Sequence, residues 1–337
     1  MNAFAGRGRD LFERGFTGPI PMMSVPEAQR LGWQLEVRHH VARLHAHLGG
    51  GQLQKDAASR SAFWCRVGLR PEMLDIVAGH LGPDILLWGA SLVVNRPGGR
   101  HAWHVDVETA DANPGRSLSI WIPLHGGGPG SELEVLPGSH RLSRSIQEVC
   151  ADSGVDHREL HDDEFARLAE AAGAGWPGEL ATARPGEAVV FDGRLWHASH
   201  NETTSTRRAL LLQYATPDTR LLTPTPGAYS WPFREADRRA RSVLVSGSDR
   251  WGVNDVVPPP PGALGRRARL GERIERIDVA SPVDGAHRAD ILFEGPTATG
   301  LHMIGHVSSL AEGHTPHPPH THQEEEVLVV LRGALLI

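Results

Sequence analysis

The sequence predicts an all-β fold, a double-stranded β-helix (jelly roll) with flanking N-terminal helices. Short strand-like runs recur between residues 85 and 215, separated by turn signals. The chain contains 38 glycines and 25 prolines, enough to supply the many turns that such a fold requires. Two helix-like segments precede the strands, and a two-sheet jelly roll accommodates helices placed in this order.

The helices are predicted from their start and stop signals. Residues 25–48 carry Pro26 in the first turn and are followed by the glycines of residues 49–51. Residues 71–81 end at Gly82 and Pro83, and residues 162–172 are expected to form a short helix within a longer insertion. Residues 1–24 are rich in glycine and arginine, so we expect them to be loosely held.

The strands that follow divide the chain into three parts. The first part, residues 1–235, contains the predicted strands 85–95, 101–108, 117–124, 131–136, 178–182, 188–192 and 208–215. Proline, arginine and serine then dominate, which indicates an extension and a proline-rich linker over residues 236–289. Strand-like runs return at 291–294, 300–308 and 326–337, so residues 290–337 form a separate predicted segment.

Composition excludes several function classes. The net charge of −6 and the absence of a basic stripe argue against a nucleic-acid partner. No apolar run approaches the ~18 residues of a membrane span, and none at the N-terminus has the features of a signal peptide. The two cysteines, Cys65 and Cys150, are too few for a disulfide framework. We therefore expect a cytoplasmic protein.

One pattern of histidine and acidic residues points to a metal site. His104 and Asp106 are two residues apart, so on a strand both would project from the same face. His197 follows about ninety positions later, and Arg208 lies eleven residues beyond it. Two imidazoles and one carboxylate leave coordination positions open, as in non-haem Fe(II) oxygenases. A lone His-x-Asp pattern is weak evidence, because such a pair is commonly only hydrogen-bonded.

The arginine suggests a second component of the same site. Its guanidinium can bind a carboxylate through two parallel N–H bonds. Arg207 is adjacent to Arg208, but on a strand it would face the other way, so we expect it to be a surface charge. By the same parity argument, His101 and His200 are expected to point away from the predicted ligands.

The context of the His-x-Asp pair resembles the phytanoyl-CoA dioxygenase family of Fe(II)/2-oxoglutarate oxygenases. The resemblance covers residues 60–216 and rests on the ordered segments HLGPDILLW, HVD, SLSIWIPL, ELEVLPGSH, RPGEAVVFDGRLWHAS and RRALLLQY. It implies that His104, Asp106 and His197 hold Fe(II). It also implies that 2-oxoglutarate is a co-substrate, with its distal carboxylate on Arg208 and with Ser199 and Asn95 as further contacts.

The resemblance further implies a reaction. O2 would be consumed, 2-oxoglutarate would yield succinate and CO2, and ascorbate would support turnover. A small-molecule substrate would be hydroxylated. Asp106 favours hydroxylation over halogenation, because halogenating members of this family and its relatives lack the carboxylate. The substrate in the family name does not transfer automatically, because one fold hosts many substrates.

A second motif lies near the C-terminus. His320 and His322 are two residues apart, Glu326 follows, and the spacing resembles the first metal motif of the cupin family. A fourth histidine would normally come from a second motif, and the sequence to Ile337 does not contain one. We therefore predict a partial cupin-like segment with an incomplete metal site. Its apolar strands would present unpaired edges, through which the chain could self-associate.

Two alternative functions remain open at this point. One is a non-catalytic metal-binding or sensing protein of the cupin type. The other is a metal-dependent isomerase or dioxygenase centred on the C-terminal motif. Arg208 favours the oxygenase, because a simple binding module does not need a carboxylate-binding arginine beside an open metal site.

Overall fold

The computed structural model describes residues 3–47, 56–107, 115–175, 177–222, 241–264, 287–295 and 303–315. The chain divides into two compact units, Met1–Arg266 and Arg267–Ile337. None of the described helices is long and apolar enough to cross a membrane.

Two β-sheets form the centre of the first unit, which confirms the predicted jelly-roll class. The larger sheet has the strand order β1-β7-β4-β9-β2-β10-β11, and the smaller has the order β3-β8-β5-β6. In the larger sheet the strands are β1 (Phe16–Pro21), β2 (Ile85–Asn95), β4 (Ser117–His125), β7 (Glu187–Asp192), β9 (Arg207–Ala215), β10 (Arg241–Ser246) and β11 (Asp255–Val257). In the smaller sheet they are β3 (Arg100–His104), β5 (Leu133–Val135), β6 (Glu179–Ala181) and β8 (His197–His200).

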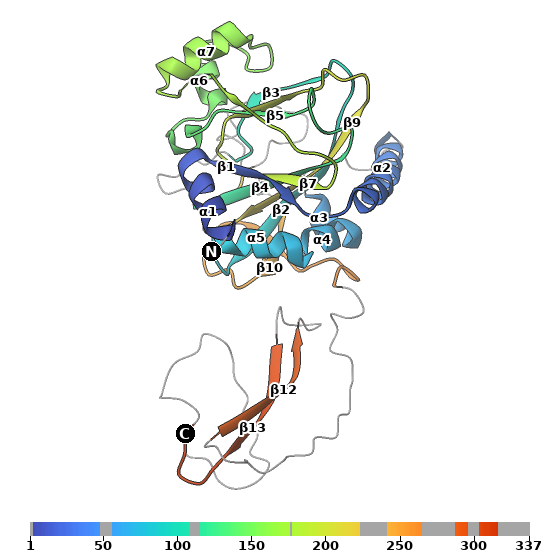
Figure 1. Cartoon of the computed structure of the whole chain (residues 1–337), viewed down its shortest axis with the longest axis vertical. Coiled ribbons are helices and arrows are strands. Elements are labelled where there is room, and N and C mark those ends of the chain that lie inside the picture. The colour runs from blue at the N-terminus through green and yellow to red at the C-terminus, as the bar shows by residue number, and fades with distance from the viewer. Residues whose placement is uncertain are drawn as a thin grey trace. The chain divides into compact units, whose positions relative to one another are not determined.

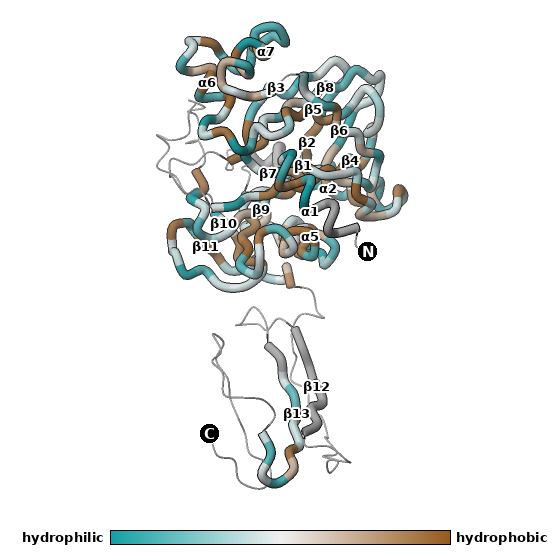
Figure 2. The backbone as a smooth tube through the Cα atoms, turned by 60° about the vertical axis from the view of Figure 1, so that its left-hand side comes forward, coloured by the Kyte–Doolittle hydropathy of each residue, from teal (hydrophilic) through white to brown (hydrophobic). Residues whose placement is uncertain are grey.

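Helices cover the outer face of the larger sheet, with α3, α4 and α5 lying below it in Figure 1. The alternation of side chains along β9 explains this packing. Leu210, Leu212 and Tyr214 join the apolar core that includes Met73 of α5, whereas Ala209 belongs to a second core between the sheets. Figure 2 shows the hydrophobic colouring along β4 and β9. The helices are α1 (Ala3–Arg14), α2 (Val25–His47), α3 (Ala57–Arg60), α4 (Ala62–Gly68) and α5 (Pro71–Leu81).

An insertion between β5 and β6 packs against the smaller sheet (Figure 1). It contains the 3-10 turn η1 (Ser139–Arg141) and the helices α6 (Ile146–Asp152) and α7 (Asp162–Ala171). Trp103 of β3 stacks on Phe165 of α7 with ring centroids 4.0 Å apart, and Trp196 meets Phe165 edge-on. These aromatic contacts belong to an apolar core that the insertion shares with the smaller sheet.

Two stretches differ from the sequence-based expectation. The N-terminal segment is not loosely held, because it forms α1 and β1, and β1 pairs with β7 as an added antiparallel strand. The predicted extension and linker from residue 236 contains β10, which pairs with β2, and β11, which pairs with β10. The larger sheet therefore continues into this stretch, and the compact unit ends at Arg266.

The second unit contains one described antiparallel pair. Strands β12 (His287–Gly295) and β13 (Met303–Leu310) correspond to two of the strands predicted for this segment. The third predicted strand and the cupin-like residues His320, His322 and Glu326 lie outside the described residues.

Candidate metal centre and adjoining cavity

The three predicted metal ligands converge in the space between the sheets. His104 ends β3 and His197 begins β8, and these two residues are register partners. One donor atom from each of His104, Asp106 and His197 lies within 4.8 Å of the others. Asp106 Oδ1 is 3.7 Å from His104 Nε2 and 4.0 Å from His197 Nε2. The strand predicted over residues 101–108 is shorter in the structure, so Asp106 lies just beyond the end of β3.

Neighbouring groups orient these donor atoms toward a common centre. His104 Nδ1 donates to the carbonyl of Ala102 at 2.7 Å, and His197 Nδ1 donates to the carbonyl of Leu195 at 2.9 Å. Because each Nδ1 carries the proton, each Nε2 presents its lone pair. Ser119 of β4 donates to Asp106 Oδ2 at 2.6 Å and leaves Oδ1 toward the imidazoles. This donor set fits a divalent metal that prefers imidazole and carboxylate.

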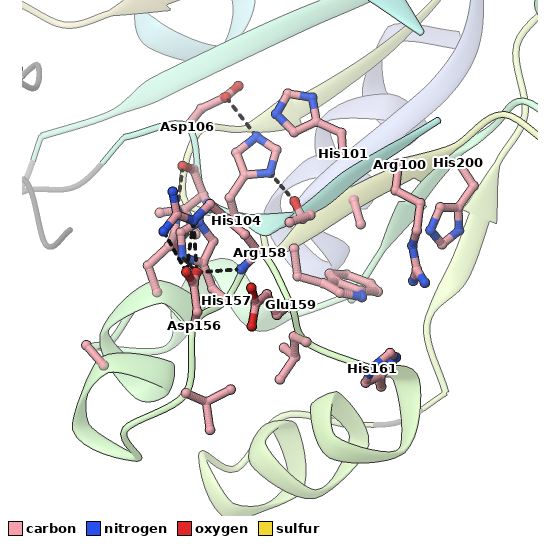
Figure 3. A pocket seen from close by; sticks show the side chains of 18 of the residues that line it. Arg100, His101, His104, Asp106, Asp156, His157, Arg158, Glu159, His161 and His200 are labelled. Carbon is pink, nitrogen blue, oxygen red and sulfur yellow. Dashed lines mark hydrogen bonds and ion pairs between the residues drawn. The ribbon is translucent and has the colours of Figure 1, made fainter. Parts of the chain in front are cut away.

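A β-bulge in β3 changes which side chains share the face of the site. Between His101 and His104 the register advances by one more residue on β3 than on β8. Such a bulge inverts the alternation, so His101 lies on the same face as His104. The two rings stack with centroids 4.6 Å apart and an interplanar angle of 9° (Figure 3). The expectation that His101 points away was therefore wrong.

Arg207, and not Arg208, faces the space between the sheets. Its side chain is fully buried, and Nη2 donates to Ser199 Oγ at 2.8 Å. Nη1 donates to the carbonyls of Ser131, Glu132 and His200. Burial lowers the pKa of Arg207 to about 10, so the guanidinium remains charged at neutral pH. No carboxylate of the described residues forms an ion pair with it.

Arg208 lies on the opposite face of β9. It forms an ion pair with Glu36 of α2 at 2.8 Å, on the side of the sheet that the helices cover. The predicted orientation of the two arginines is therefore wrong. The sequence did contain a signal for the correct orientation. Arg208, Leu210 and Leu212 are two residues apart along the strand and therefore share one face, and the large apolar residues on that face pack against the helices.

Asn95 and Ser199, which were predicted to share a site with Arg208, lie close to the buried Arg207 instead. Asn95 is the register partner of Arg207 across β2 and β9 and is 7% exposed. Asn95 Nδ2 and Arg207 Nε are both buried and have no hydrogen-bond partner among the described residues. An unsatisfied buried donor costs ~1–3 kcal/mol. Two such donors beside a buried guanidinium that forms no ion pair with the described carboxylates fit a buried anionic ligand.

A cavity of about 960 Å³ adjoins His104 and Asp106. Its walls combine the metal side of β3 with the loop between α6 and α7, and Val93 and Leu211 contribute apolar surface from the larger sheet. The charged lining groups are largely paired, because Arg158 binds Asp156 through its Nε and Nη2. Burial lowers the pKa of His157, so its imidazole is neutral at neutral pH.

The cavity extends from the metal ligands along the edge of β3 toward a second polar group. Figure 3 shows Arg100 and His200 beside each other, apart from the cluster of Asp156 and Arg158. Arg100 pairs with Asp162 at 3.3 Å. The pKa of His200 is lowered by burial and by Arg100. The cavity is thus polar at both ends and nearly balanced in charge.

A family model described as phytanoyl-CoA dioxygenase matches residues 42–209 of the chain, about half of its length. No curated protein matches. Solved structures that resemble it include a non-heme monooxygenase, ThoJ, in its apo form (21% identity, TM-score 0.49, covering 75% of this chain and 86% of that one). A second is CytC3 with Fe(II) and alpha-ketoglutarate (18% identity, TM-score 0.49, covering 76% and 93%). A third is the alpha-ketoglutarate-dependent epimerase SnoN (17% identity, TM-score 0.47, covering 67% and 87%).

Proposed function

Because the chain belongs to the phytanoyl-CoA dioxygenase family, we propose that it is an Fe(II)- and 2-oxoglutarate-dependent dioxygenase that hydroxylates a small molecule. The observation that carries this proposal is the convergence of His104, Asp106 and His197 within 4.8 Å of one another. These residues would hold the iron through His104 Nε2, His197 Nε2 and Asp106 Oδ1. When bound, iron would bind and activate O2, and 2-oxoglutarate would supply two electrons for the reduction of O2 as it is converted to succinate and CO2.

Arg207 is the residue that we propose for the distal carboxylate of 2-oxoglutarate, in place of Arg208. Its guanidinium is buried, charged and without a carboxylate partner in the described part of the chain. Its free Nε–H, together with the second hydrogen on Nη2, offers two parallel donors to one carboxylate. Ser199 holds the guanidinium in place, and Asn95 Nδ2 supplies another donor at the same end of the site.

We propose that the substrate occupies the cavity beside His104 and Asp106. Its volume of about 960 Å³ is at the upper end of the range for small-molecule pockets, ~300–1,000 Å³. His101 presents a ring surface directly next to the ligand His104, where it can contact a bound substrate. The loop between α6 and α7 closes the opposite wall, so it is the part of the chain that would select the substrate.

Hydroxylation is the proposed outcome because the carboxylate of Asp106 is present and is held by Ser119. With this ligand in place, no coordination position is freed for a halide. We also propose a cytoplasmic location, in keeping with the free, buried thiols of Cys65 and Cys150.

The test is succinate formation by the purified full-length chain with Fe(II), 2-oxoglutarate, O2 and ascorbate. We expect succinate from the wild type above the level of His104→Ala, and stimulation by a small-molecule substrate that gains one oxygen atom from labelled O2. Absence of succinate with every small molecule tested would favour a metal-binding or sensing protein. Turnover that needs no 2-oxoglutarate would instead indicate a reaction centred on the C-terminal motif.

A further inference from the structure

Val105 lies between the proposed ligands His104, which ends β3, and Asp106, and in the described part of the chain a side chain holds its backbone instead of a neighbouring strand. Among the described strands, β3 is at the edge of the smaller sheet and pairs with β8 alone. Immediately after it, Val105 N–H donates to Gln147 Oε1 at 3.1 Å, and Gln147 Nε2 donates to the Val105 carbonyl at 3.2 Å. The Gln147 amide therefore supplies the donor and the acceptor that a neighbouring strand would otherwise provide.

Gln147 has little freedom to move away from this position. It is 2% exposed and lies in the first turn of α6, between the core residues Ile146 and Val149. The helix begins with a capping box in which Ser145 and Glu148 satisfy each other's backbone N–H groups. The amide is thus fixed by packing on one side and by two buried hydrogen bonds on the other.

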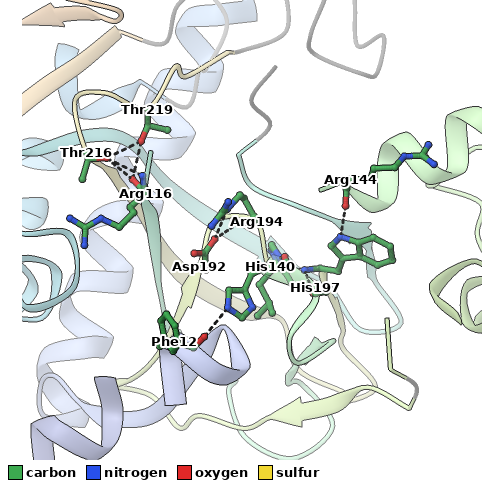
Figure 4. A network of polar contacts seen from close by, with 12 residues as sticks. Phe12, Arg116, His140, Arg144, Asp192, Arg194, His197, Thr216 and Thr219 are labelled. Atoms are coloured by element: carbon green, nitrogen blue, oxygen red, sulfur yellow. Dashed lines mark hydrogen bonds and ion pairs between the residues drawn. The ribbon is translucent and has the colours of Figure 1, made fainter. Parts of the chain in front are cut away.

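The same segment also holds the third ligand. Trp196, which precedes His197, donates its indole N–H to the carbonyl of Arg144 at 3.2 Å (Figure 4). The backbone N–H of Trp196 donates to Ser139 Oγ at 2.9 Å. Residues 139–147 therefore contact the chain beside both ligand-bearing strands, although they contribute no ligand themselves.

We propose that Gln147 is a positioning residue for the metal centre, an inference that rests on the proposed function. By fixing the Val105 peptide, its amide sets the relative direction of His104 and Asp106, which project from either side of that peptide. Asp106 is also anchored from its far side, because its backbone N–H donates to the Gly193 carbonyl at 2.8 Å and Ser119 donates to its Oδ2. Gln147 supplies the support on the Val105 side, and without it the separation of 3.7 Å between Asp106 Oδ1 and His104 Nε2 would be less tightly fixed. Gln147 also lines the cavity, so the substrate wall and the metal ligands share this residue.

The test is a titration of the metal-free full-length protein with Co(II), followed by its visible absorption, without any turnover. Gln147→Met keeps the length of the side chain but removes both hydrogen bonds. We expect its Co(II) dissociation constant to rise ~10- to 100-fold, the usual effect of losing a residue that orients a metal ligand. Gln147→Glu keeps the acceptor for Val105 N–H and loses the donor to the Val105 carbonyl. We therefore expect a smaller rise in the Co(II) dissociation constant than in Gln147→Met.

Ser145→Ala is the matched control, because it removes the N-cap of α6 but leaves the Gln147 amide. We expect it to lower the unfolding midpoint while the Co(II) dissociation constant stays within about twofold of the wild type. Equal weakening by Ser145→Ala and Gln147→Met would overturn the proposal, as would unchanged binding by Gln147→Met. If Gln147→Met does not fold, Gln147→Glu is the deciding variant. A raised Co(II) dissociation constant in Gln147→Glu would support the proposal, and an unchanged one would overturn it. A wild type that binds no Co(II) would overturn the proposed function itself.

Discussion

Replacing Arg207 by methionine tests the assignment of the co-substrate site. The exchange removes a buried charge that has one hydroxyl and three carbonyl partners, and an Nε–H with none. Two N–H donors would reach the distal carboxylate of 2-oxoglutarate, and hydrogen bonds to charged groups contribute ~1.5–3 kcal/mol each. Their loss amounts to ~3–6 kcal/mol, so we expect 2-oxoglutarate to bind ~10²- to 10⁴-fold more weakly.

The assay is calorimetric titration of the Co(II)-loaded protein with 2-oxoglutarate, with the thermal unfolding midpoint as a check on folding. Arg208→Met is the control, because Arg208 is the neighbouring residue but pairs with Glu36 on the helix side of the sheet. A partly exposed ion pair of this kind contributes ~1 kcal/mol or less to stability, and we expect its removal to leave 2-oxoglutarate binding unchanged. Equal affinities of the Arg207→Met variant and the wild type, or a loss confined to Arg208→Met, would refute the assignment.

Three further predictions concern Ser119, His140 and the second unit. Ser119→Ala removes the hydrogen bond to Asp106 Oδ2, so we expect ~10- to 100-fold weaker Co(II) binding, and an unchanged titration would contradict this role. Burial lowers the pKa of His140 below its usual value, so the unfolded chain takes up the proton first and the free energy of unfolding should fall as pH drops below about 6.5, by at most ~1.4 kcal/mol per pH unit (Figure 4). Urea unfolding at several pH values should show that the free energy of unfolding depends less on pH in His140→Gln than in the wild type. Identical slopes in the two proteins would exclude His140 as the source of the pH dependence. A chain truncated after Arg266 should retain the unfolding midpoint and the 2-oxoglutarate affinity of the full chain, because all described ligands lie in that unit, and loss of either would show that the second unit is required.

Local patterns in the sequence were sufficient for the elements that carry them strongly. The helix over residues 71–81 and the strand over residues 85–95 have the predicted bounds, because proline, glycine and apolar runs mark their ends. The convergence of His104, Asp106 and His197 was also predicted, although spacing alone could not show it. That prediction came from the ordered family segments around the ligands.

What the sequence could not provide depends on contacts between distant segments. The bulge in β3 is visible only in its pairing with β8, and it reverses the expected direction of His101. β1 and β10 were missed because each is short and is stabilised by joining a sheet formed elsewhere in the chain. The support of Val105 by Gln147 joins residues 42 positions apart, and no local period predicts such a contact.

The two halves of the proposed reaction depend on different parts of the fold. Arg207, Asn95 and Ser199 come from paired strands and are at most 7% exposed, so substitutions near them would disturb the sheets themselves. The cavity beside His104 is lined instead by the loop between α6 and α7, whose Arg158 and Glu159 are exposed. Exposed loop residues tolerate change far better than paired strand residues. The proposed co-substrate end of the site is therefore constrained by the fold. The insertion would be free to set the substrate, except at Gln147, which we propose also supports the metal ligands.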